Sequence, residues 1–363
     1  MEGMPPPHRK WTWAADRRCG KRRWAGLQAC RPCQLSWLIR ATLAALGWLA
    51  TLSASGDEVQ RASGVVTPRP LPQDAQVPAR FQLASQAFAW QARRMQTVTP
   101  TLEVWDVTFP SPVVTEVPAN NTVHAEYYRS RRDGRRPAVI VLHILGGDFP
   151  LSRLFCNCLA QHGVHALFVK MPYYGPRRDP ASPRRMVATD PHQTVLGMTQ
   201  AVLDIRRATA WLAERPEVDP SQLGIFGISL GGITAALSLA VEPRLTSGCL
   251  LLAGGDIAQV GWEAAELKAV RASWEAQGGT RETFQAAFRE IDPVTYAALA
   301  RGKRILMLNA TDDEVIPRRC TLALWEALGQ PKLVWYSGGH YSVIRHLPRA
   351  LLQVAAFFAD PRP

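Results

Sequence analysis

A serine lies between glycines in the segment Gly227-Ile228-Ser229-Leu230-Gly231, which has the pattern GxSxG. An apolar run from Leu223 precedes it and an Ala- and Leu-rich stretch follows, which predicts a buried strand, a sharp turn and a helix. The two glycines leave space for such a turn. A serine at the tip of a helix suits a nucleophile, because the helix dipole favours developing negative charge. The alternative is a strand-to-helix turn with an incidental serine.

A serine hydroxyl becomes a nucleophile when a base accepts its proton and a carboxylate orients that base. Downstream, the apolar run from Ile305 to Leu308 precedes two adjacent acids, Asp312 and Asp313. A second apolar run, from Leu333 to Tyr336, precedes His340. Each residue alone could be an ordinary loop residue, and an acid here could also cap a helix. Serine, acid and histidine in this order, each after a predicted strand, indicate a catalytic triad.

This order of residues resembles that of the α/β-hydrolase superfamily, over roughly Leu102 to Asp360. The resemblance implies an α/β fold with a mostly parallel central sheet and helices on both faces. The segment "MPYYGPRR" also resembles the branches that contain abhydrolase domain-containing protein 18 and the acetyl xylan esterases. The implied activity is that of a serine esterase that cleaves a small-molecule or carbohydrate ester through an acyl-enzyme, without a metal or an organic cofactor. An acyltransferase or peptidase with the same triad, or a non-catalytic binding protein on the same fold, stays an alternative.

The spacing of the acid loop selects between the two aspartates. In the superfamily the acid commonly follows a GxxD step and precedes a proline by four residues. Here Ala310 takes the place of the glycine, and Pro317 lies four residues beyond Asp313. The resemblance therefore implies that Ser229 attacks, that His340 accepts its proton and that Asp313, rather than Asp312, orients the imidazole.

The oxyanion hole is expected beside the strand from Ala138 to Leu142, which His143 and a Gly146-Gly147 turn follow. The superfamily has HG or HGGG there, whereas this chain has Ile144 after the histidine. The resemblance implies backbone N–H donors from Leu230 and from either Leu145 or Gly146.

A pocket wall is predicted at Tyr174-Gly175-Pro176-Arg177-Arg178, in the loop that follows the next apolar strand at the sheet edge where ligands bind. The side chains expected at the pocket are His143, Tyr174 and Arg177. For the loop's arginines, Arg177 and Arg178, the alternative is a solvated loop.

The first 55 residues read as a leader that is separate from the catalytic region. Nine Lys and Arg and two Asp and Glu give residues 1–55 a net charge of +7, out of +12 for the whole chain. The apolar stretch from Ala41 to Leu52 and the small residues up to Ser55 predict a secretory signal peptide that is cleaved after Ser55, and so a secreted or periplasmic protein without stable membrane insertion. A retained membrane anchor is the alternative, and the true start could lie downstream of Met1.

The mildly basic remainder has no clustered basic helix or aromatic platform, so nucleic-acid binding is not expected. Residues 56–95, rich in Pro, Gln, Ser and Ala near their start, predict a flexible linker, and residues 96–363 the catalytic domain. The ranges Leu102–Phe109 and Thr122–Arg129 are expected to be the first antiparallel strands, with a turn at Asp133-Gly134 closing a hairpin to the strand at Ala138.

Helix-favouring stretches and the cysteines complete the prediction. A helix over His192–Glu214 would place apolar residues on one face, and residues 256–302 predict either ordinary surface helices or a helical cap over the pocket. The cysteines give no disulfide framework, and the Cys30–Cys33 pair lacks the second pair that a zinc site needs. No metal site is expected.

Overall fold

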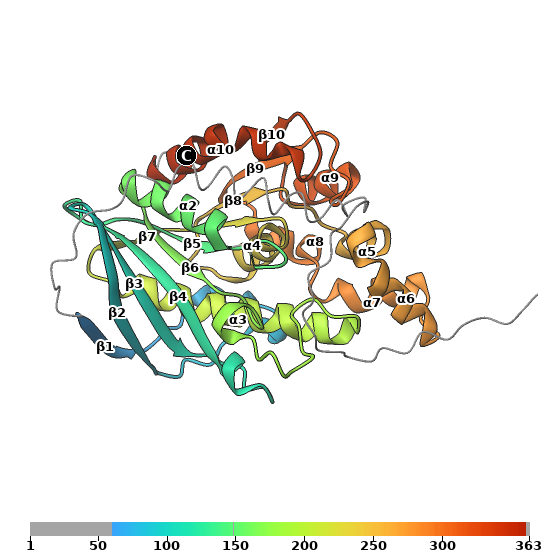
Figure 1. The fold of residues 1–363 in the computed structure, drawn as a ribbon, viewed down its shortest axis with the longest axis horizontal. Coiled ribbons are helices and arrows are strands. Elements are labelled where there is room, and N and C mark those ends of the chain that lie inside the picture. Colours follow the sequence, from blue (N-terminus) through green and yellow to red (C-terminus); the bar gives the residue numbers. More distant parts are fainter. Residues whose placement is uncertain (1–59, 148, 361–363) are drawn as a thin grey trace, which may run out of the picture. The chain divides into compact units, whose positions relative to one another are not determined.

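The computed structural model describes residues 60–147 and 149–360. The predicted signal peptide, its cleavage site and the Cys30–Cys33 pair lie outside the described residues. The described part of the chain forms a ten-stranded sheet covered by helices (Figure 1).

The strands are β1 (Arg61–Val66), β2 (Phe88–Thr99), β3 (Leu102–Pro110), β4 (Thr122–Ser130), β5 (Arg136–Leu142), β6 (His165–Val169), β7 (Val218–Ile228), β8 (Ser247–Leu251), β9 (Arg304–Ala310) and β10 (Lys332–Tyr336). Their order in the sheet is β1-β2-β3-β4-β6-β5-β7-β8-β9-β10. The pairs from β1 to β6 are antiparallel, and the pairs from β6 to β10 are parallel. The carboxyl ends of the parallel strands therefore meet at one edge of the sheet, where ligands bind in folds of this type.

The α-helices are α2 (Phe149–Gln161), α3 (Pro191–Ala213), α4 (Leu230–Val241), α5 (Ile257–Glu263), α6 (Lys268–Ala276), α7 (Arg281–Arg289), α8 (Pro293–Tyr296), α9 (Arg318–Ala327) and α10 (Leu347–Ala359). Short 3-10 helices are η1 (Pro72–Gln76), η2 (Ala79–Phe81), η3 (Pro118–Asn121), η4 (Gly175–Arg177), η5 (Ala265–Leu267), η6 (Ala297–Ala300) and η7 (Ser342–His346).

Two hydrophobic clusters, one on each face of the sheet, form the core. In β5, Ile140 and Leu142 join the cluster of α3, α4 and α9, while Val139 and Val141 join the cluster of α2 and α10. Figure 1 shows α2 and α10 on one side of the sheet and α3 on the other. A parallel strand that is covered on both faces buries all of its side chains, which explains why the central strands are continuous apolar runs in the sequence. The predicted architecture, a mostly parallel sheet with helices on both faces, is confirmed.

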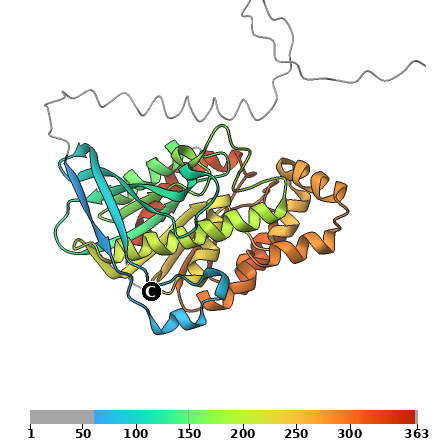
Figure 2. The same cartoon turned by 90° about the horizontal axis from the view of Figure 1, so that it is seen from below.

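Helix α3 closely matches the predicted helix over His192–Glu214. The apolar residues expected on one face are all buried, namely Val195, Met198, Val202, Ile205 and Leu212. Asp190 caps the helix by accepting a hydrogen bond from the His192 backbone N–H at 2.9 Å. The helix runs beneath the sheet from the β1 end toward the helices α5 to α7 (Figure 2).

The prediction of a flexible linker over residues 56–95 is wrong for the part that the structure describes. Strand β1 pairs with β2, and β2 pairs with β3, so the sheet begins well before the predicted first strand. Between β1 and β2, the Phe81 side chain is fully buried and contacts Tyr296 edge to face at 5.4 Å. The polar composition of this segment led to the prediction of a linker instead of a strand. An edge strand needs apolar residues on only one face, so it can be polar overall.

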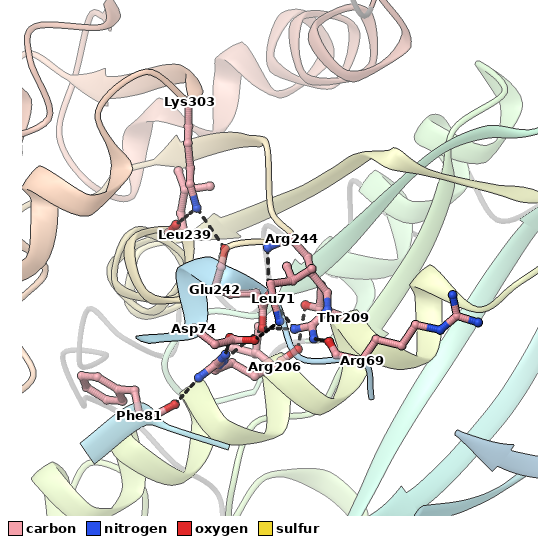
Figure 3. Close-up of polar contacts among 11 residues, drawn as sticks. Arg69, Leu71, Asp74, Phe81, Arg206, Thr209, Leu239, Glu242, Arg244 and Lys303 are labelled. Carbon is pink, nitrogen blue, oxygen red and sulfur yellow. Dashed lines mark hydrogen bonds and ion pairs between the residues drawn. The ribbon is translucent and has the colours of Figure 1, made fainter. Parts of the chain in front are cut away.

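A charged network connects the same segment to α3 and to the end of α4 (Figure 3). Arg206 of α3 donates to the Phe81 carbonyl, to the Asp74 carboxylate and, at 3.0 Å, to Glu242 at the end of α4. Glu242 is fully buried and also accepts hydrogen bonds from the Arg244 side chain at 2.9 and 3.2 Å. Arg244 in turn donates to the backbone carbonyl of Arg69, a residue that precedes η1, at 2.7 Å.

The prediction of a hairpin around Asp133-Gly134 is also wrong. Gly134 has the positive φ of a turn residue, and residues 131–135 are exposed as expected. However, β4 pairs with β3 and β6, and β6 lies between β4 and β5. The turn therefore connects two strands that are not neighbours, because the parallel pairing of β5 with β6 takes the position that a hairpin would need.

The segment 256–302 is helical, as predicted, and contains α5 to α8. Helix α7 packs against α3 and α5, and α5 also contacts α9. The role of this segment as a cap stays a prediction. No helix in residues 60–147 and 149–360 combines the length and the apolar character that crossing a membrane requires.

Candidate active site

Ser229 occupies the turn between β7 and α4. Its backbone has φ 54° and ψ −116°, a conformation that costs a non-glycine residue of order 1–3 kcal/mol. The turn is fixed by hydrogen bonds at both ends, because the Ser229 N–H donates to the Leu251 carbonyl at 2.9 Å and the Ile233 N–H donates to the Ser229 carbonyl at 2.9 Å. This geometry holds the hydroxyl at the first turn of α4, beyond the end of β7.

The glycines of the GxSxG pattern are required by close backbone contacts. A Cβ atom on Gly227 would lie 2.0 Å from the Gly231 carbonyl oxygen, and one on Gly231 would lie 2.6 Å from the His143 carbonyl oxygen. Both distances are far shorter than any van der Waals contact. The explanation that these glycines leave room for the turn is confirmed, and the second contact brings the loop after β5 against the start of α4.

Ser229, His340 and Asp313 form one chain of hydrogen bonds. His340 Nδ1 lies 2.9 Å from both carboxylate oxygens of Asp313, and His340 Nε2 lies 3.0 Å from Ser229 Oγ. A carboxylate beside Nδ1 favours the tautomer that carries its proton there. Nε2 is then free to accept the proton of the serine hydroxyl. The side chains of His340 and Asp313 are only 7% and 2% exposed, so water competes little for these contacts.

The two adjacent aspartates have different environments. Asp313 accepts backbone hydrogen bonds from Val315 at 2.9 Å and from Ile316 at 2.7 Å, in addition to its contact with the imidazole. Asp312 is exposed and accepts a hydrogen bond from the Thr311 hydroxyl at 2.7 Å. The structure thus places Asp313 beside His340 and turns Asp312 toward solvent.

Glu314 was missed by reasoning from the sequence. Its carboxylate accepts a hydrogen bond from the His340 backbone N–H at 2.8 Å. A Cβ atom on Gly339 would lie 2.2 Å from the same carboxylate, so this contact needs the glycine before the histidine. Two consecutive acids therefore hold His340, one by its side chain and one by its backbone. The adjacency of Glu314 to Asp313 was the available signal.

The loops that carry the acid and the histidine are joined by further backbone contacts. The Thr311 N–H donates to the Tyr336 carbonyl at 2.9 Å, and the Asp312 N–H donates to the Gly338 carbonyl at 3.0 Å. The Gly338 N–H donates to the Thr311 hydroxyl at 3.2 Å. The parallel pairing of β9 with β10 thus continues beyond the strands and sets the distance between Asp313 and His340.

The residues expected around an oxyanion lie at the ends of β5 and β7. Leu230 is the first residue of α4, whose first backbone N–H groups have no acceptor within the helix. In the loop after β5, the Leu145 side chain is 41% exposed and Gly146 has φ 88°. Burial raises the pKa of the Tyr174 hydroxyl, and the adjacent Gly146 backbone acts in the opposite direction.

His143 does not line an open pocket, and its ring instead connects two loops. It is fully buried, Nδ1 donates to the Ile144 carbonyl at 2.8 Å, and Nε2 accepts from the Met171 N–H at 3.1 Å. Burial lowers the pKa of His143 to about 4, so the ring is neutral at pH 7. Tyr174 packs edge to face on the ring at 4.6 Å. The sequence could not show that both ring nitrogens are occupied.

Arg177 is likewise neither a pocket wall nor a solvated side chain. It has 0% exposure, and its guanidinium lies 2.8 Å from the Asp204 carboxylate. It also donates to the carbonyls of Asn120 at 2.8 Å and Lys170 at 3.1 Å. The neighbouring Arg178 is exposed, as the alternative prediction had it. Arg177 is buried because its partner on α3 neutralises the charge.

Comparisons with known proteins agree with this architecture. The family model described as "Alpha/beta hydrolase domain containing 18" matches residues 90–258, and the prolyl oligopeptidase family matches residues 198–350. Uncharacterized proteins from two Mycobacterium tuberculosis strains are 30% identical over 262 residues. The match covers 67% of this chain and 60% of each relative, so the chain spans about 60% of the length of these relatives.

Solved structures with the same fold include two acetyl xylan esterases. The enzyme from Thermoanaerobacterium sp. JW/SL YS485 has a TM-score of 0.62 at 18% identity, covering 81% of this chain and 97% of the enzyme. The enzyme from Paenibacillus sp. R4 has a TM-score of 0.61 at 18% identity, covering 79% of this chain and 99% of the enzyme. The two family models, which match residues 90–258 and 198–350, show together with the strand order and the serine turn after β7 that the chain belongs to the α/β-hydrolase superfamily.

Proposed function

We propose that the protein is a serine hydrolase that cleaves carboxylic esters through an acyl-enzyme. The observation that carries the proposal is the unbroken hydrogen-bond chain from Asp313 through His340 to Ser229, at 2.9 and 3.0 Å. A positioned base is what an unreactive hydroxyl needs, and a buried carboxylate behind the base stabilises the imidazolium that forms.

The proposed reaction has two halves. Ser229 Oγ attacks the ester carbonyl carbon while its proton moves to His340 Nε2, which gives a tetrahedral oxyanion. The intermediate collapses, His340 returns a proton to the leaving alcohol, and the acyl group stays on Ser229. A water molecule, deprotonated by His340, then attacks the acyl-enzyme, and His340 returns that proton to Ser229 Oγ as the carboxylic acid leaves.

Backbone amides are proposed to hold the oxyanion. The Leu230 N–H lies at the start of α4, where the helix dipole favours negative charge. For the second donor we propose Leu145 rather than Gly146, because the Gly146 backbone already contacts Tyr174. The contact that a Gly231 Cβ would make with the His143 carbonyl supports the closeness of these two segments.

Active-site labelling tests the proposal directly. A fluorophosphonate should add to the wild-type protein and raise its intact mass by one adduct, whereas Ser229→Ala should not react. Ser238→Ala is the matched control, because Ser238 lies buried in α4, the helix that Ser229 precedes, and its hydroxyl has no hydrogen-bond partner among the described residues. Equal labelling of Ser229→Ala would overturn the proposal and favour a binding protein on this fold.

The choice of substrates follows from the comparisons. Because two proteins of similar fold are acetyl xylan esterases, acetylated xylo-oligosaccharides belong in a panel with acetyl, butyryl and long-chain p-nitrophenyl esters. A peptidase is the second candidate, because the prolyl oligopeptidase family matches the region that holds the triad. Faster cleavage of a proline-containing peptide than of any ester would favour it. Acyl transfer to an added alcohol, in preference to water, would indicate an acyltransferase.

We also propose that the protein is exported, on the strength of the apolar stretch from Ala41 to Leu52 alone. Protein recovered outside the cell or in the periplasm should begin near Gly56 on N-terminal sequencing. An intact leader on protein in the membrane fraction would instead indicate an anchor.

A further inference from the structure

The strands β1, β2 and β3 present a grid of polar side chains on one face. The register places Arg61 opposite Arg93 and Arg93 opposite Asp106. The neighbouring row places Ser63 opposite Gln91 and Gln91 opposite Thr108. Because side chains two residues apart on a strand point to the same face, these residues share one side of the sheet. We name this set the β1–β3 hollow, and it consists of Arg61, Ser63, Gln91, Arg93, Asp106 and Thr108.

The hollow is a concave site with an accessible volume of about 490 Å³. Arg61, Ser63, Gln91 and Arg93 are exposed, whereas Asp106 and Thr108 are half-buried. On the opposite face, Ala92 and Val107 pair with each other and belong to the hydrophobic core. The polar face is therefore the outer one, and no core packing fixes the identity of its side chains.

The two arginines of the hollow have no ion-pair partner within residues 60–147 and 149–360. The one polar contact that the Arg93 guanidinium makes there is with the Met95 sulfur at 3.4 Å. By contrast, Arg129 and Arg131 of the neighbouring segment both lie near the Glu103 carboxylate, at 3.5 and 3.7 Å. Like charges directly opposite each other on neighbouring strands are destabilising, so a bound anion would remove an unfavourable contact.

Asp106 lies opposite Arg93 in the register but forms no ion pair with either arginine within residues 60–147 and 149–360. Its carboxylate acts on His124 and Lys170, which lie on the side of β4 and β6, away from β1. Two guanidinium groups with free donors remain at the edge of the sheet. Guanidinium groups bind carboxylates and phosphates through paired N–H donors, and they do so better than ammonium groups because their donors are planar and fixed.

The second row of the hollow supplies neutral donors and acceptors. Two hydroxyls, on Ser63 and Thr108, flank the Gln91 amide, and such groups can both donate and accept hydrogen bonds. This row lies one step along the strands from the two arginines. Groups that could bind an anion and groups that could bind hydroxyls therefore lie next to each other on the same surface.

We propose that the β1–β3 hollow binds a sugar that carries an oxyanion, a carboxylate or a phosphate, with the anion between Arg61 and Arg93 and the sugar hydroxyls on Ser63, Gln91 and Thr108. Between β2 and β7, which precedes Ser229, the sheet has five strand spacings, roughly 25 Å. The hollow is therefore separate from the catalytic serine and would bind a second part of a substrate or a separate ligand.

Calorimetric titration of the wild-type protein at low salt tests this proposal without any reference to catalysis. The ligands are glucuronate, glucose 6-phosphate, inorganic phosphate and neutral glucose. We expect glucuronate or glucose 6-phosphate to bind at least tenfold more tightly than glucose and than phosphate alone, and the tighter of the two identifies the oxyanion. Increasing the salt concentration should weaken this binding.

Substitution then locates the site. The double variant Arg61→Gln/Arg93→Gln should lose at least tenfold in affinity, whereas Arg135→Gln, an exposed arginine of the β4–β5 turn, should bind as wild type does. Hydrolysis of p-nitrophenyl acetate, which carries neither a sugar nor an anionic group, should be unchanged in all three proteins. Absence of binding by the wild type, equal binding by the double variant, or binding of phosphate as tight as that of the sugar phosphate would overturn the proposal.

Discussion

The candidate active site and the β1–β3 hollow lie in the same sheet, but their polar groups are organised differently. Around Ser229, each group of the proposed triad is held by another: Asp313 accepts two backbone N–H groups, and His340 is held through both its ring and its backbone. In the hollow, the Arg61 and Arg93 guanidinium groups form no ion pair among the described residues.

This difference separates two uses of polar side chains. A catalytic group must be preorganised, because the reaction gains only from interactions that are already in place when charge develops. A surface that binds a ligand keeps donors free until the ligand arrives. Substitutions at the first site should therefore change turnover by large factors, and substitutions at the second should change turnover and stability little.

The largest effect is expected at Ser229, the proposed nucleophile. Ser229→Ala removes the attacking atom, and loss of a triad nucleophile lowers turnover by about 10⁶. The elbow tolerates alanine sterically, so the protein should still fold. Steady-state ester hydrolysis together with circular dichroism checks both statements. Near-normal turnover by a folded variant would remove Ser229 from the mechanism.

The next effect concerns the choice between adjacent acids. Asp313→Asn keeps the shape of the side chain but favours the wrong imidazole tautomer, which lowered turnover by about 10⁴ in a well-studied triad. Asp312→Asn should change turnover little, because Asp312 faces solvent. The ratio of the two kcat values, measured on folded proteins, is decisive. The opposite ranking would transfer the role to Asp312.

Glu314 should give an intermediate effect, as a positioning residue that acts through the His340 backbone. A hydrogen bond to a charged group contributes about 1.5–3 kcal/mol, so Glu314→Ala should lower kcat by roughly ten- to a hundredfold. Glu314→Gln keeps an oxygen acceptor and should retain most of the turnover. Equal losses in the two variants would show that the charge, and not the contact, matters.

The boundary between the two regions contains a pH-sensitive contact. His165 of β6 accepts from the Ser130 N–H of β4 at 3.1 Å and donates to the Glu217 carbonyl at 3.2 Å, and burial lowers its pKa to about 4. Below about pH 6.5 the unfolded chain binds a proton on this ring while the folded chain does not until about pH 4. The free energy of unfolding should therefore fall as the pH decreases from 7 to 4.

Chemical denaturation at several pH values measures this loss. Burial lowers the pKa of His143 to about 4 as well, so that ring contributes in the same direction. His165→Gln can supply an acceptor and a donor without titrating in this range. The variant should show a smaller decrease in stability between pH 7 and pH 4, and an unchanged decrease would assign the effect to other groups.

The smallest effect is expected in the hollow. Arg93→Gln removes one of two like charges on facing strands, so the free energy of unfolding should stay the same or rise by up to about 1 kcal/mol. Denaturation at low and high salt measures the change, which should shrink as salt screens the repulsion. A loss of more than about 1 kcal/mol would indicate that Arg93 is held by the fold, like the groups around Ser229.

Local sequence patterns predicted those parts of the site that depend on short stretches of chain. The GxSxG glycines predict a turn that only small residues allow. The four-residue spacing from Asp313 to Pro317 selected the acid that the structure places beside His340. The apolar runs before Ser229, Asp313 and His340 correspond to the parallel strands β7, β9 and β10.

The unpredicted parts depend on partners that are distant in the sequence. Arg177 is buried because Asp204, on α3, neutralises it, and no local pattern identifies that pair. Glu314 accepts a hydrogen bond from a backbone N–H, and because every non-proline residue has such a group, the residue types do not indicate this contact. Strand β1 is short and polar on its outer face, so only its pairing with β2 shows that it belongs to the sheet.

The fully buried Glu242 carboxylate bears on how the molecule unfolds. If the segment containing Asp74 and Phe81 separated from the rest, Arg206 would lose two of its three acceptors, and Arg244 would lose its contact with Arg69. Leaving buried charged groups unsatisfied is unfavourable by several kcal/mol. Separation of this segment from the rest of the molecule is therefore coupled to the unfolding of α3 and of the end of α4. Heating should unfold the described part of the chain in one cooperative transition.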